Sequence, residues 1–306
     1  MLFLTNPANP GKFQRRVSLF ALFALFWLMG CASIPYHYTR NVEDRFVLKL
    51  EPAELQIERG RPVWLVDALG HYILSLPSKI LLLNWRVDNH KVSSETEKKL
   101  QAYLLDNDLE NVKVRLNQYA PGAEWRRLIR NPWMQGGWRY TLGVLTMVYY
   151  TILPGRLFGG DNYNPYTNTI NIYSDHKAIV LHEAGHARDF TKQTRGFRGV
   201  YAFLRIFPLV PLYHEKQATS DAIGYDWDKL LYDDLKADYK ILYPAYCTYI
   251  AGEGLRWVQT SYWIQYAVMF AAVIPGHIVG RIKAATIEPS ESPAPNHTDK
   301  PMDQSS

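Results

Sequence analysis

The chain has 306 residues, of which 47% are hydrophobic and 14% aromatic, and it carries 34 Lys and Arg against 29 Asp and Glu with only two cysteines. A chain this long and apolar can bury a large core, so the composition excludes a disordered protein, a collagen-like repeat and a disulfide-dense scaffold. The formal charge of +5 leaves a nucleic-acid binder open, because a basic surface attracts polyanions.

The first 30 residues have the pattern of a secretory signal peptide. An uninterrupted apolar run at 17–29 follows three basic residues, Lys12, Arg15 and Arg16. The run is shorter than the roughly 20 residues that span a bilayer. Its ending, Leu-Met-Gly-Cys, resembles the lipobox of bacterial lipoproteins, in which Cys31 is acylated and becomes the mature N-terminus. An uncleaved N-terminal anchor is the alternative interpretation.

This N-terminal pattern changes the meaning of the charge. Residues 1–30 contain three basic residues and no acidic one, so the mature chain has 31 basic against 29 acidic residues and a charge of +2. We therefore expect no nucleic-acid partner. Ala32 stands where an aspartate would favour inner-membrane retention, so the resemblance implies an outer-membrane lipoprotein facing the periplasm. Acylation of Cys31 leaves Cys247 without an intrachain partner, and the fold must then depend on its core.

The mature chain divides into three parts by composition. We expect a tether and the first structured elements at 31–60 and a folded domain at 61–284. Residues 285–306 are rich in Pro, Ser and Asp and poor in apolar residues, which predicts a disordered tail.

Several elements of the domain can be predicted in chain order. A capping box at Ser94–Glu97 begins one helix, and Trp125–Arg130 forms another. Alternation of apolar and polar residues predicts a half-buried strand at Asn111–Asn117 and an edge strand at Asn168–Tyr173. A further helix is expected to follow this edge strand, with Ser174 as its N-cap, Thr194 near its end and Gly196 as its stop. A second polar-faced helix is expected from Tyr213 towards Tyr232.

Three apolar stretches remain, at Tyr140–Leu153, Tyr201–Leu212 and Tyr262–Val279. The first is too short to span a membrane, and prolines and polar residues interrupt the other two. Each stretch is expected either to be buried or to lie at a membrane interface. The sequence leaves this choice open.

A metal-binding motif follows the predicted edge strand. His182-Glu183-Ala184-Gly185-His186 has the form H-E-x-x-H, and residues four apart lie on one helix face, so both imidazoles can bind one ion. Zinc accepts two neutral histidines, a third protein ligand and a water molecule. Glu183 can then act as general base towards that water. Two unrelated histidines on a surface helix are the alternative interpretation.

This order of elements resembles the zincin metallopeptidases, in which an edge strand precedes the H-E-x-x-H helix and aligns the substrate backbone. The resemblance covers residues 159–226, under a quarter of the chain. It implies a zincin-like α+β fold, with a small mixed sheet beside a predominantly helical body. The metzincin pattern is excluded because Lys192 stands where it requires histidine and Asp189 stands where it requires glycine.

A gluzincin-like pattern is more similar, and it takes the third ligand from a glutamate on a later helix. Glu215, Ala218 and Ala222 share one helix face, so the small residues let this helix place Glu215 against the metal. His214 and Asp221 are rival third ligands. A solvated surface charge is the ordinary alternative for Glu215.

The supporting groups are less specific. Many gluzincins place an aspartate four residues after the ligand, but this position is Thr219, so Asp221 or Asp189 would have to orient a histidine. His277 is a candidate donor to a transition-state oxyanion, and a structural histidine within an apolar stretch is the alternative. Asp161–Tyr163 could line the cleft or form an ordinary turn.

The sequence thus predicts a lipid-anchored, Zn²⁺-dependent endopeptidase of the bacterial cell envelope that acts on a peptide or protein substrate. His182, His186 and Glu215 would hold the zinc, and Glu183 would activate water. The rival interpretation is a non-catalytic structural or assembly lipoprotein whose metal site is stabilising or absent. Substrate specificity and oligomeric state cannot be read from the sequence.

Overall fold

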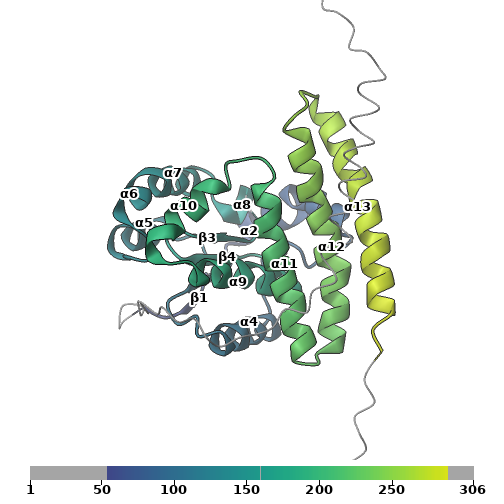
Figure 1. The fold of residues 1–306 in the computed structure, drawn as a ribbon, viewed down its shortest axis with the longest axis horizontal. Coiled ribbons are helices and arrows are strands. Elements are labelled where there is room, and N and C mark those ends of the chain that lie inside the picture. The colour runs from purple at the N-terminus through teal and green to yellow at the C-terminus, as the bar shows by residue number, and fades with distance from the viewer. Residues whose placement is uncertain (1–53, 159, 289–306) are drawn as a thin grey trace, which may run out of the picture.

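The computed structural model describes residues 54–158 and 160–288. Their fold is α+β and mostly helical, with one four-stranded mixed sheet (Figure 1). This confirms the coarse fold class predicted from the sequence. The predicted signal peptide at 1–30, the lipobox residue Cys31 and most of the predicted tail lie outside the described residues.

The strands are β1 (Ile57–Arg59), β2 (Lys113–Leu116), β3 (Asn162–Asn164) and β4 (Thr169–Ile172). The longer helices are α4 (Ser94–Asp106), α5 (Pro121–Arg130), α7 (Val144–Ile152), α9 (Lys177–Lys192), α10 (Arg195–Leu204), α11 (Val210–Asp228), α12 (Tyr232–Leu255) and α13 (Tyr262–Ala285). The shorter ones are α2 (Trp64–Leu69), α3 (Leu76–Leu82), α6 (Gly136–Trp138) and α8 (Gly155–Phe158), with π-helical turns η1 (Gly70–Leu74) and η2 (Arg139–Gly143).

The sheet has the order β1-β2-β4-β3, in which β2 is parallel to β1 and β4. All four side chains of β2 are buried, so the prediction of a half-buried strand is wrong at its polar positions, Lys113 and Arg115. Acidic partners explain their burial. Glu58 of β1 lies 2.7 Å from Lys113 Nζ, and Glu124 of α5 lies 2.7 Å from Arg115 Nε. These pairings offset the cost of removing the two cations from water.

The strand predicted as the edge of the sheet is an interior strand. β4 falls within the predicted range Asn168–Tyr173, but it pairs with β2 on one side and with β3 on the other. β3 and β4 are antiparallel, and the turn between them places Asn168 at a φ of 53°. The edge prediction is wrong because this turn returns the chain alongside the preceding three residues. β3 therefore forms the end of the sheet on this side.

Two helix N-caps differ from the predicted ones by one or two residues. Helix α4 is capped by Ser93 rather than Ser94, and the Ser93 hydroxyl accepts a backbone hydrogen bond at 3.3 Å. Helix α9 is capped by His176 rather than Ser174, and its Nδ1 accepts a backbone hydrogen bond at 3.2 Å. Ser174 serves another purpose, because its hydroxyl donates to Asp161.

The predicted helix boundaries also need correction. Helix α9 ends at Lys192, and Gly196 lies in the first turn of α10 instead of terminating a helix. The second predicted helix is α11, which begins at Val210 with a proline in its first turn, where proline is tolerated. It ends at Asp228, and Tyr232 already begins α12.

The three apolar stretches are largely exposed. The first forms η2 and α7, the second is divided between α10, a loop and α11, and the third belongs to α13, which continues through Pro275. Of the nine residues of α7, only Met147 and Tyr150 are buried. Large side chains of all three stretches face outwards, so these segments cannot be assigned to the core alone.

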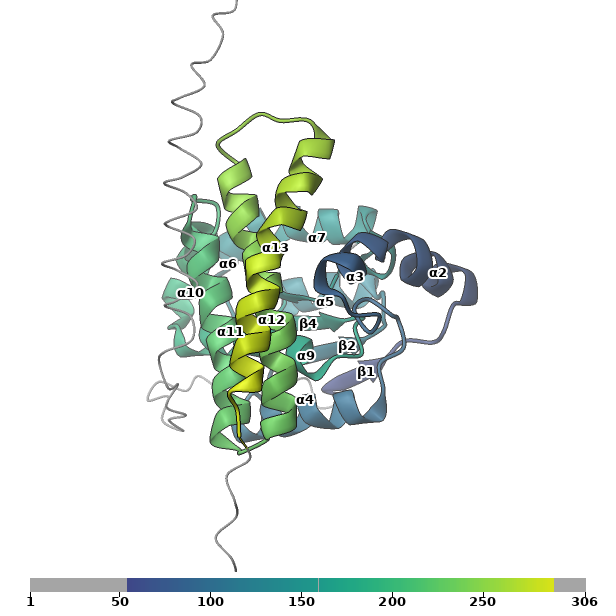
Figure 2. The ribbon, with the colours of Figure 1, turned by 90° about the vertical axis from the view of Figure 1, so that its right-hand side faces the viewer.

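Helices α12 and α13 form an antiparallel hairpin beside α11, and the tip of this hairpin projects beyond the rest of the fold (Figure 2). The two helices approach closely at Gly280, where a Cβ atom would lie 2.3 Å from the carbonyl oxygen of Tyr239. Close backbone contact therefore holds α12 and α13 together in the part of the hairpin away from its tip.

A buried acidic cluster lies where α11, α12 and α4 meet. Lys99 of α4 pairs with Asp226 of α11 and lies 2.8 Å from Asp234 of α12. Asp238 is fully buried next to Asp226. Burial and the neighbouring carboxylate of Asp226 hold the pKa of Asp238 well above its usual value. Native Asp238 therefore keeps its proton to a higher pH than it does in the unfolded chain.

This cluster predicts a pH dependence of stability. Above the ordinary aspartate pKa of 3.8 the unfolded chain loses a proton that native Asp238 retains, so native stability falls as pH rises. Asp238→Asn removes this effect. We expect the difference in unfolding free energy to move in favour of the variant as the pH rises above 3.8, by at most about 1.4 kcal/mol per pH unit. Urea unfolding across this range checks it, and parallel pH profiles for both proteins would contradict the assignment.

Candidate metal centre

The H-E-x-x-H helix α9 crosses α11 at very short range. A Cβ atom on Gly185 would lie 3.0 Å from the carbonyl oxygen of Ala218, which is tighter than most Cβ contacts in proteins. Ala218 and Ala222 are completely buried at this contact, as their spacing on one helix face predicted. Glu215 lies one turn before Ala218, so the crossing places its carboxylate against α9.

Three side chains from the two helices converge at this point. Glu215 Oε2 lies 3.1 Å from His182 Nε2 and 3.4 Å from His186 Nε2. All three side chains are buried, and their ligand atoms lie within 4.8 Å of one another. The structure thus brings together the two histidines and the glutamate that the sequence selected as ligands.

The geometry of this group fits a zinc ion. Bonds of about 2.0–2.2 Å from one tetrahedral ion place two ligand atoms roughly 3.3 Å apart, which agrees with the separations from Glu215 Oε2 to the two imidazole nitrogens. Burial lowers the pKa of His186 to about 4, so this imidazole is neutral, as a metal ligand must be. Two imidazoles and a carboxylate form a typical catalytic zinc donor set.

Neighbouring groups hold two of the three candidate ligands in position. His182 Nδ1 lies 3.4 Å from the Thr219 hydroxyl, so Thr219 takes the place that the family pattern gives to an aspartate. Arg205, at the end of α10, donates to Glu215 Oε1 at 3.0 Å. Burial would raise the pKa of Glu215, but His186 and His182 hold it well below its usual value. The carboxylate is therefore ionised and oriented, with Oε2 towards the histidines.

Glu183 is buried beside the candidate ligands. Burial raises the pKa of Glu183 to about 8, with Glu215 and Asp161 adding to the shift and His182 opposing it. A cation held by the three ligands would favour the ionised form of Glu183 by direct attraction. A carboxylate in this position can take a proton from a water molecule at the metal.

Two residues of the site were missed by reasoning from the sequence. The hydroxyl of Tyr249, on α12, lies near Glu215, and the negative charge of this carboxylate raises the pKa of Tyr249 well above its usual value. In the sequence, Arg205 stands out only as a charged residue within the apolar stretch Tyr201–Leu212. Neither residue belongs to a local motif, because each reaches Glu215 only through the packing of its helix.

The rival ligands and the other supporting candidates have different contacts. Asp221 accepts hydrogen bonds from Arg188 and Tyr103, and Asp189 accepts one from Tyr201 at 2.6 Å. Neither contact involves a candidate ligand.

His214 and His277 also make contacts with residues other than the candidate ligands. The ring of His214 packs on Tyr201 with centroids 4.3 Å apart. His277 Nε2 bonds to the carbonyl oxygen of Leu81 at 2.8 Å and joins α13 to the end of α3. The structural interpretation of His277 fits this contact, and the structure gives its oxyanion role no support.

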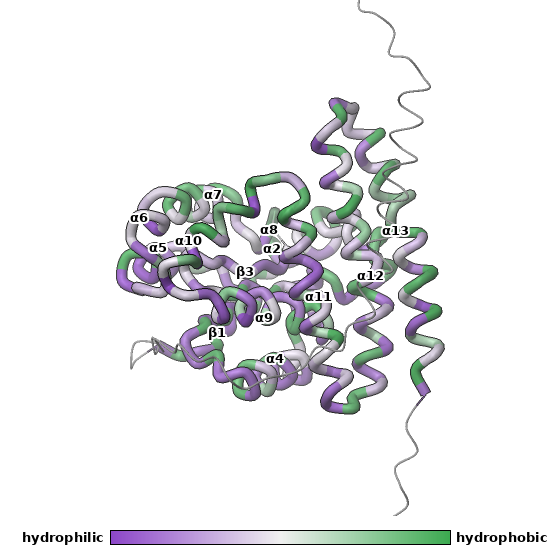
Figure 3. Tube along the Cα trace, in the orientation of Figure 1, coloured by the Kyte–Doolittle hydropathy of each residue, from purple (hydrophilic) through white to green (hydrophobic). Residues whose placement is uncertain are grey.

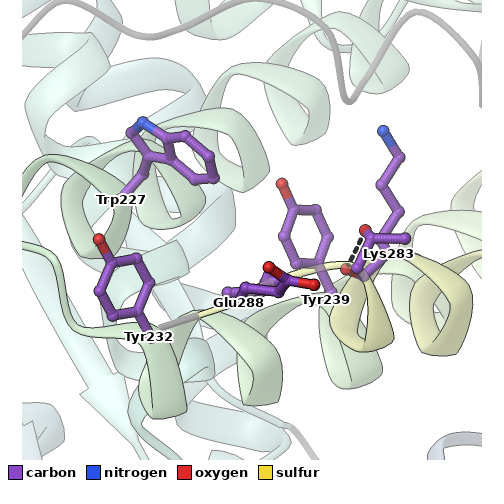
Figure 4. Close-up of a pocket in the computed structure, with 7 residues that line it drawn as sticks. Trp227, Tyr232, Tyr239, Lys283 and Glu288 are labelled. Atoms are coloured by element: carbon purple, nitrogen blue, oxygen red, sulfur yellow. Dashed lines mark hydrogen bonds between the residues drawn. The ribbon is translucent and has the colours of Figure 1, made fainter. Parts of the chain in front are cut away.

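A surface pocket lies away from the metal centre, at the end of α13 and beside the turn between α11 and α12 (Figure 4). It is lined by Trp227, Tyr232, Tyr239, Lys283, Thr286, Ile287 and Glu288. None of these residues contacts a candidate ligand or Glu183 in the described part of the chain. The pocket therefore does not belong to the candidate site.

Comparison with known proteins adds no family to this picture. No protein-family model, curated protein or solved structure matches the chain with significance. The case for a metal centre accordingly rests on the motif and on the geometry of its residues.

The helix crossing at Gly185 gives a test of this geometry. Gly185→Val would press α11 away from α9, and we expect zinc affinity to fall about 10–100-fold, as when supporting contacts of a metal site are lost. Overpacking should also cost about 1–3 kcal/mol of stability. Gly122→Val is the control, because a Cβ atom there meets nothing within 4 Å. Competition with a chromophoric chelator measures the affinity, and equal zinc binding by both variants would contradict the role of the crossing.

Proposed function

We propose that this chain is a zinc-dependent endopeptidase of the bacterial cell envelope, attached to a membrane through lipidated Cys31. The observation that carries the proposal is the convergence of His182, His186 and Glu215, with Glu183 buried beside them on the same helix. The sequence pattern before Cys31 supports the cellular location. An outer-membrane protein facing the periplasm is the form of attachment that we propose.

In this proposal each residue has a separate task. The zinc ion, when bound, polarises the peptide carbonyl and acidifies a water molecule. Glu183 accepts the proton of that water as it attacks the carbonyl carbon, and then delivers the proton to the leaving amine. Arg205 keeps Glu215 oriented through its Oε1. Tyr249, whose hydroxyl lies at Glu215, is placed to donate a hydrogen bond to the carbonyl oxygen as negative charge develops there.

The substrate backbone would pair with β3. An extended peptide needs an unpaired strand edge, and β4 has none because β2 and β3 flank it. β3 packs against α9 and forms the end of the sheet. With three residues it offers few backbone hydrogen bonds, so most of the binding energy must come from side-chain contacts.

The role of Glu183 is tested by Glu183→Gln, which keeps the shape of the side chain and removes its basicity. We expect one zinc per chain to be retained while peptide hydrolysis falls by about 10²–10⁴-fold. Zinc content and cleavage of a broad peptide library are measured on the same sample. Glu95→Gln, on the outer side of α4, is the control and should leave both unchanged.

Two results would reject the proposal, and one of them favours the rival. If the Glu183→Gln variant hydrolyses peptides at an unchanged rate, Glu183 is not the general base. If the unmutated mature protein binds zinc but cleaves no peptide, and a chelator changes only its melting temperature, the metal is stabilising. The chain would then be a structural or assembly lipoprotein.

A further inference from the structure

Large apolar side chains are exposed on four segments of the fold. They lie on α2 to α3, on η2 and α7, on the loop between α10 and α11, and on the first half of α13. We call these segments the apolar face. Examples are Trp64, Tyr72, Leu145, Tyr149, Ile206, Phe207, Trp263 and Ile264. In the tube coloured by hydropathy, α7 and the loop before α11 are mostly hydrophobic (Figure 3).

These segments lie on the side of the molecule away from α4 and β1, in both views of the ribbon (Figures 1 and 2). A hydrogen bond joins the loop before α11 to the hairpin, because the backbone N–H of Leu209 donates to Glu253 of α12 at 2.9 Å. Glu253 also pairs with Arg256 at 3.1 Å, so this acid is neutralised. From 257 to 280 the chain has no Asp, Glu, Lys or Arg.

The first turns of α13 are exposed on almost every face. Trp263 is 83% exposed, and nearly all residues from Tyr262 to Ala271 have exposed side chains. A protein partner packs on one face of a helix, whereas lipid can surround it. A helix end that is mostly apolar on every face and uncharged is typical of insertion into a bilayer. Exposed tryptophans, such as Trp64 and Trp263, are typical of a membrane interface.

The dimensions favour insertion into one leaflet over a complete span. By length and composition, α13 is the one straight helix of the described residues that could cross a membrane. Its second half is packed on α12 through Gly276 and Gly280, and α12 carries Asp233, Asp234 and Asp238. The exposed part, Tyr262–Ala272, is about 16 Å long at 1.5 Å per residue. One leaflet of the hydrocarbon core is roughly 15 Å thick.

The N-terminal segment allows this arrangement. Twenty-two residues, 32–53, separate Cys31 from the first described residue, and an extended chain of that length reaches roughly 75 Å. Either the lipid on Cys31 or an uncleaved run at 17–29 would hold this end at a membrane. The tether is then long enough for the apolar face to settle on the same bilayer.

We propose that the apolar face rests in the interface of a lipid bilayer, with the tip of the α12–α13 hairpin inserted into one leaflet. This attachment is additional to the N-terminal anchor. It also places the loop that follows Arg205, and with it one side of the candidate metal centre, at the membrane surface. The proposal concerns a surface only, and it stands whether or not the metal centre is catalytic.

Spin labels on the full-length chain test the proposal in vesicles of phosphatidylethanolamine and phosphatidylglycerol. Single cysteines replace Ile264, Leu145 and Ile206 on the apolar face, with Leu105 and Leu230 as equally exposed apolar controls on the opposite side. The unmutated chain is labelled in parallel, so that any signal from buried Cys247 can be subtracted. We expect the three test labels to show a several-fold higher ratio of oxygen to water-soluble nickel accessibility than both controls.

Two outcomes would overturn the proposal. If the labels at all five positions are equally accessible to nickel, the apolar face lies in water and the chain is held by its N-terminus alone. If only Ile264 is immersed, together with a label at Ile282 near the other end of α13, the helix spans the bilayer and the face does not rest on it. Thermal unfolding of each labelled chain confirms that it is folded.

Discussion

The contact between α9 and α11 is the constraint on which the candidate site depends. The two helices approach so closely that a Cβ atom on Gly185 would lie 3.0 Å from the carbonyl oxygen of Ala218, and Ala218 and Ala222 are completely buried on α11. This spacing fixes how far the Glu215 carboxylate stands from the histidines of α9. The rest of the fold supports the contact from outside, with α4 and α12 packed against α9 and the sheet beside it.

Several buried charges in the described part of the chain are paired with opposite charges. Lys113 and Arg115 in the centre of the sheet meet Glu58 and Glu124, and Lys99 meets Asp226. The metal centre follows the same rule, because Glu215 faces two imidazoles and a guanidinium. An unpaired charge would cost far more than these pairs do, so the protein can hold polar chemistry inside a helical core.

The sequence allowed the centre of the site to be predicted, but not its surroundings. The i, i+4 spacing of His182 and His186 and the small residues after Glu215 are local patterns, and the structure brings those three residues together. Arg205 and Tyr249 reach Glu215 by tertiary packing, which leaves no periodic signal.

The same limit applies to the fold, because local elements could be predicted and their tertiary arrangement could not. Alternation located β4, yet its place in the sheet depends on the three-residue strand β3, which is too short to be recognised from its pattern. The helix caps were displaced because several polar residues stand near each start. β2 was not predicted as an interior strand because Lys113 and Arg115 are charged residues, which are usually exposed. Their acidic partners lie on other elements, β1 and α5.

The pairing of Glu215 with Arg205 has a consequence for how the protein matures. The carboxylate is satisfied by this guanidinium and by the imidazoles before any ion arrives, so the helices can close around it without metal. Small zinc domains, in contrast, stay unfolded until they are loaded. For the exported zinc enzyme that we propose, folding of the two helices and binding of the ion can therefore be separate events.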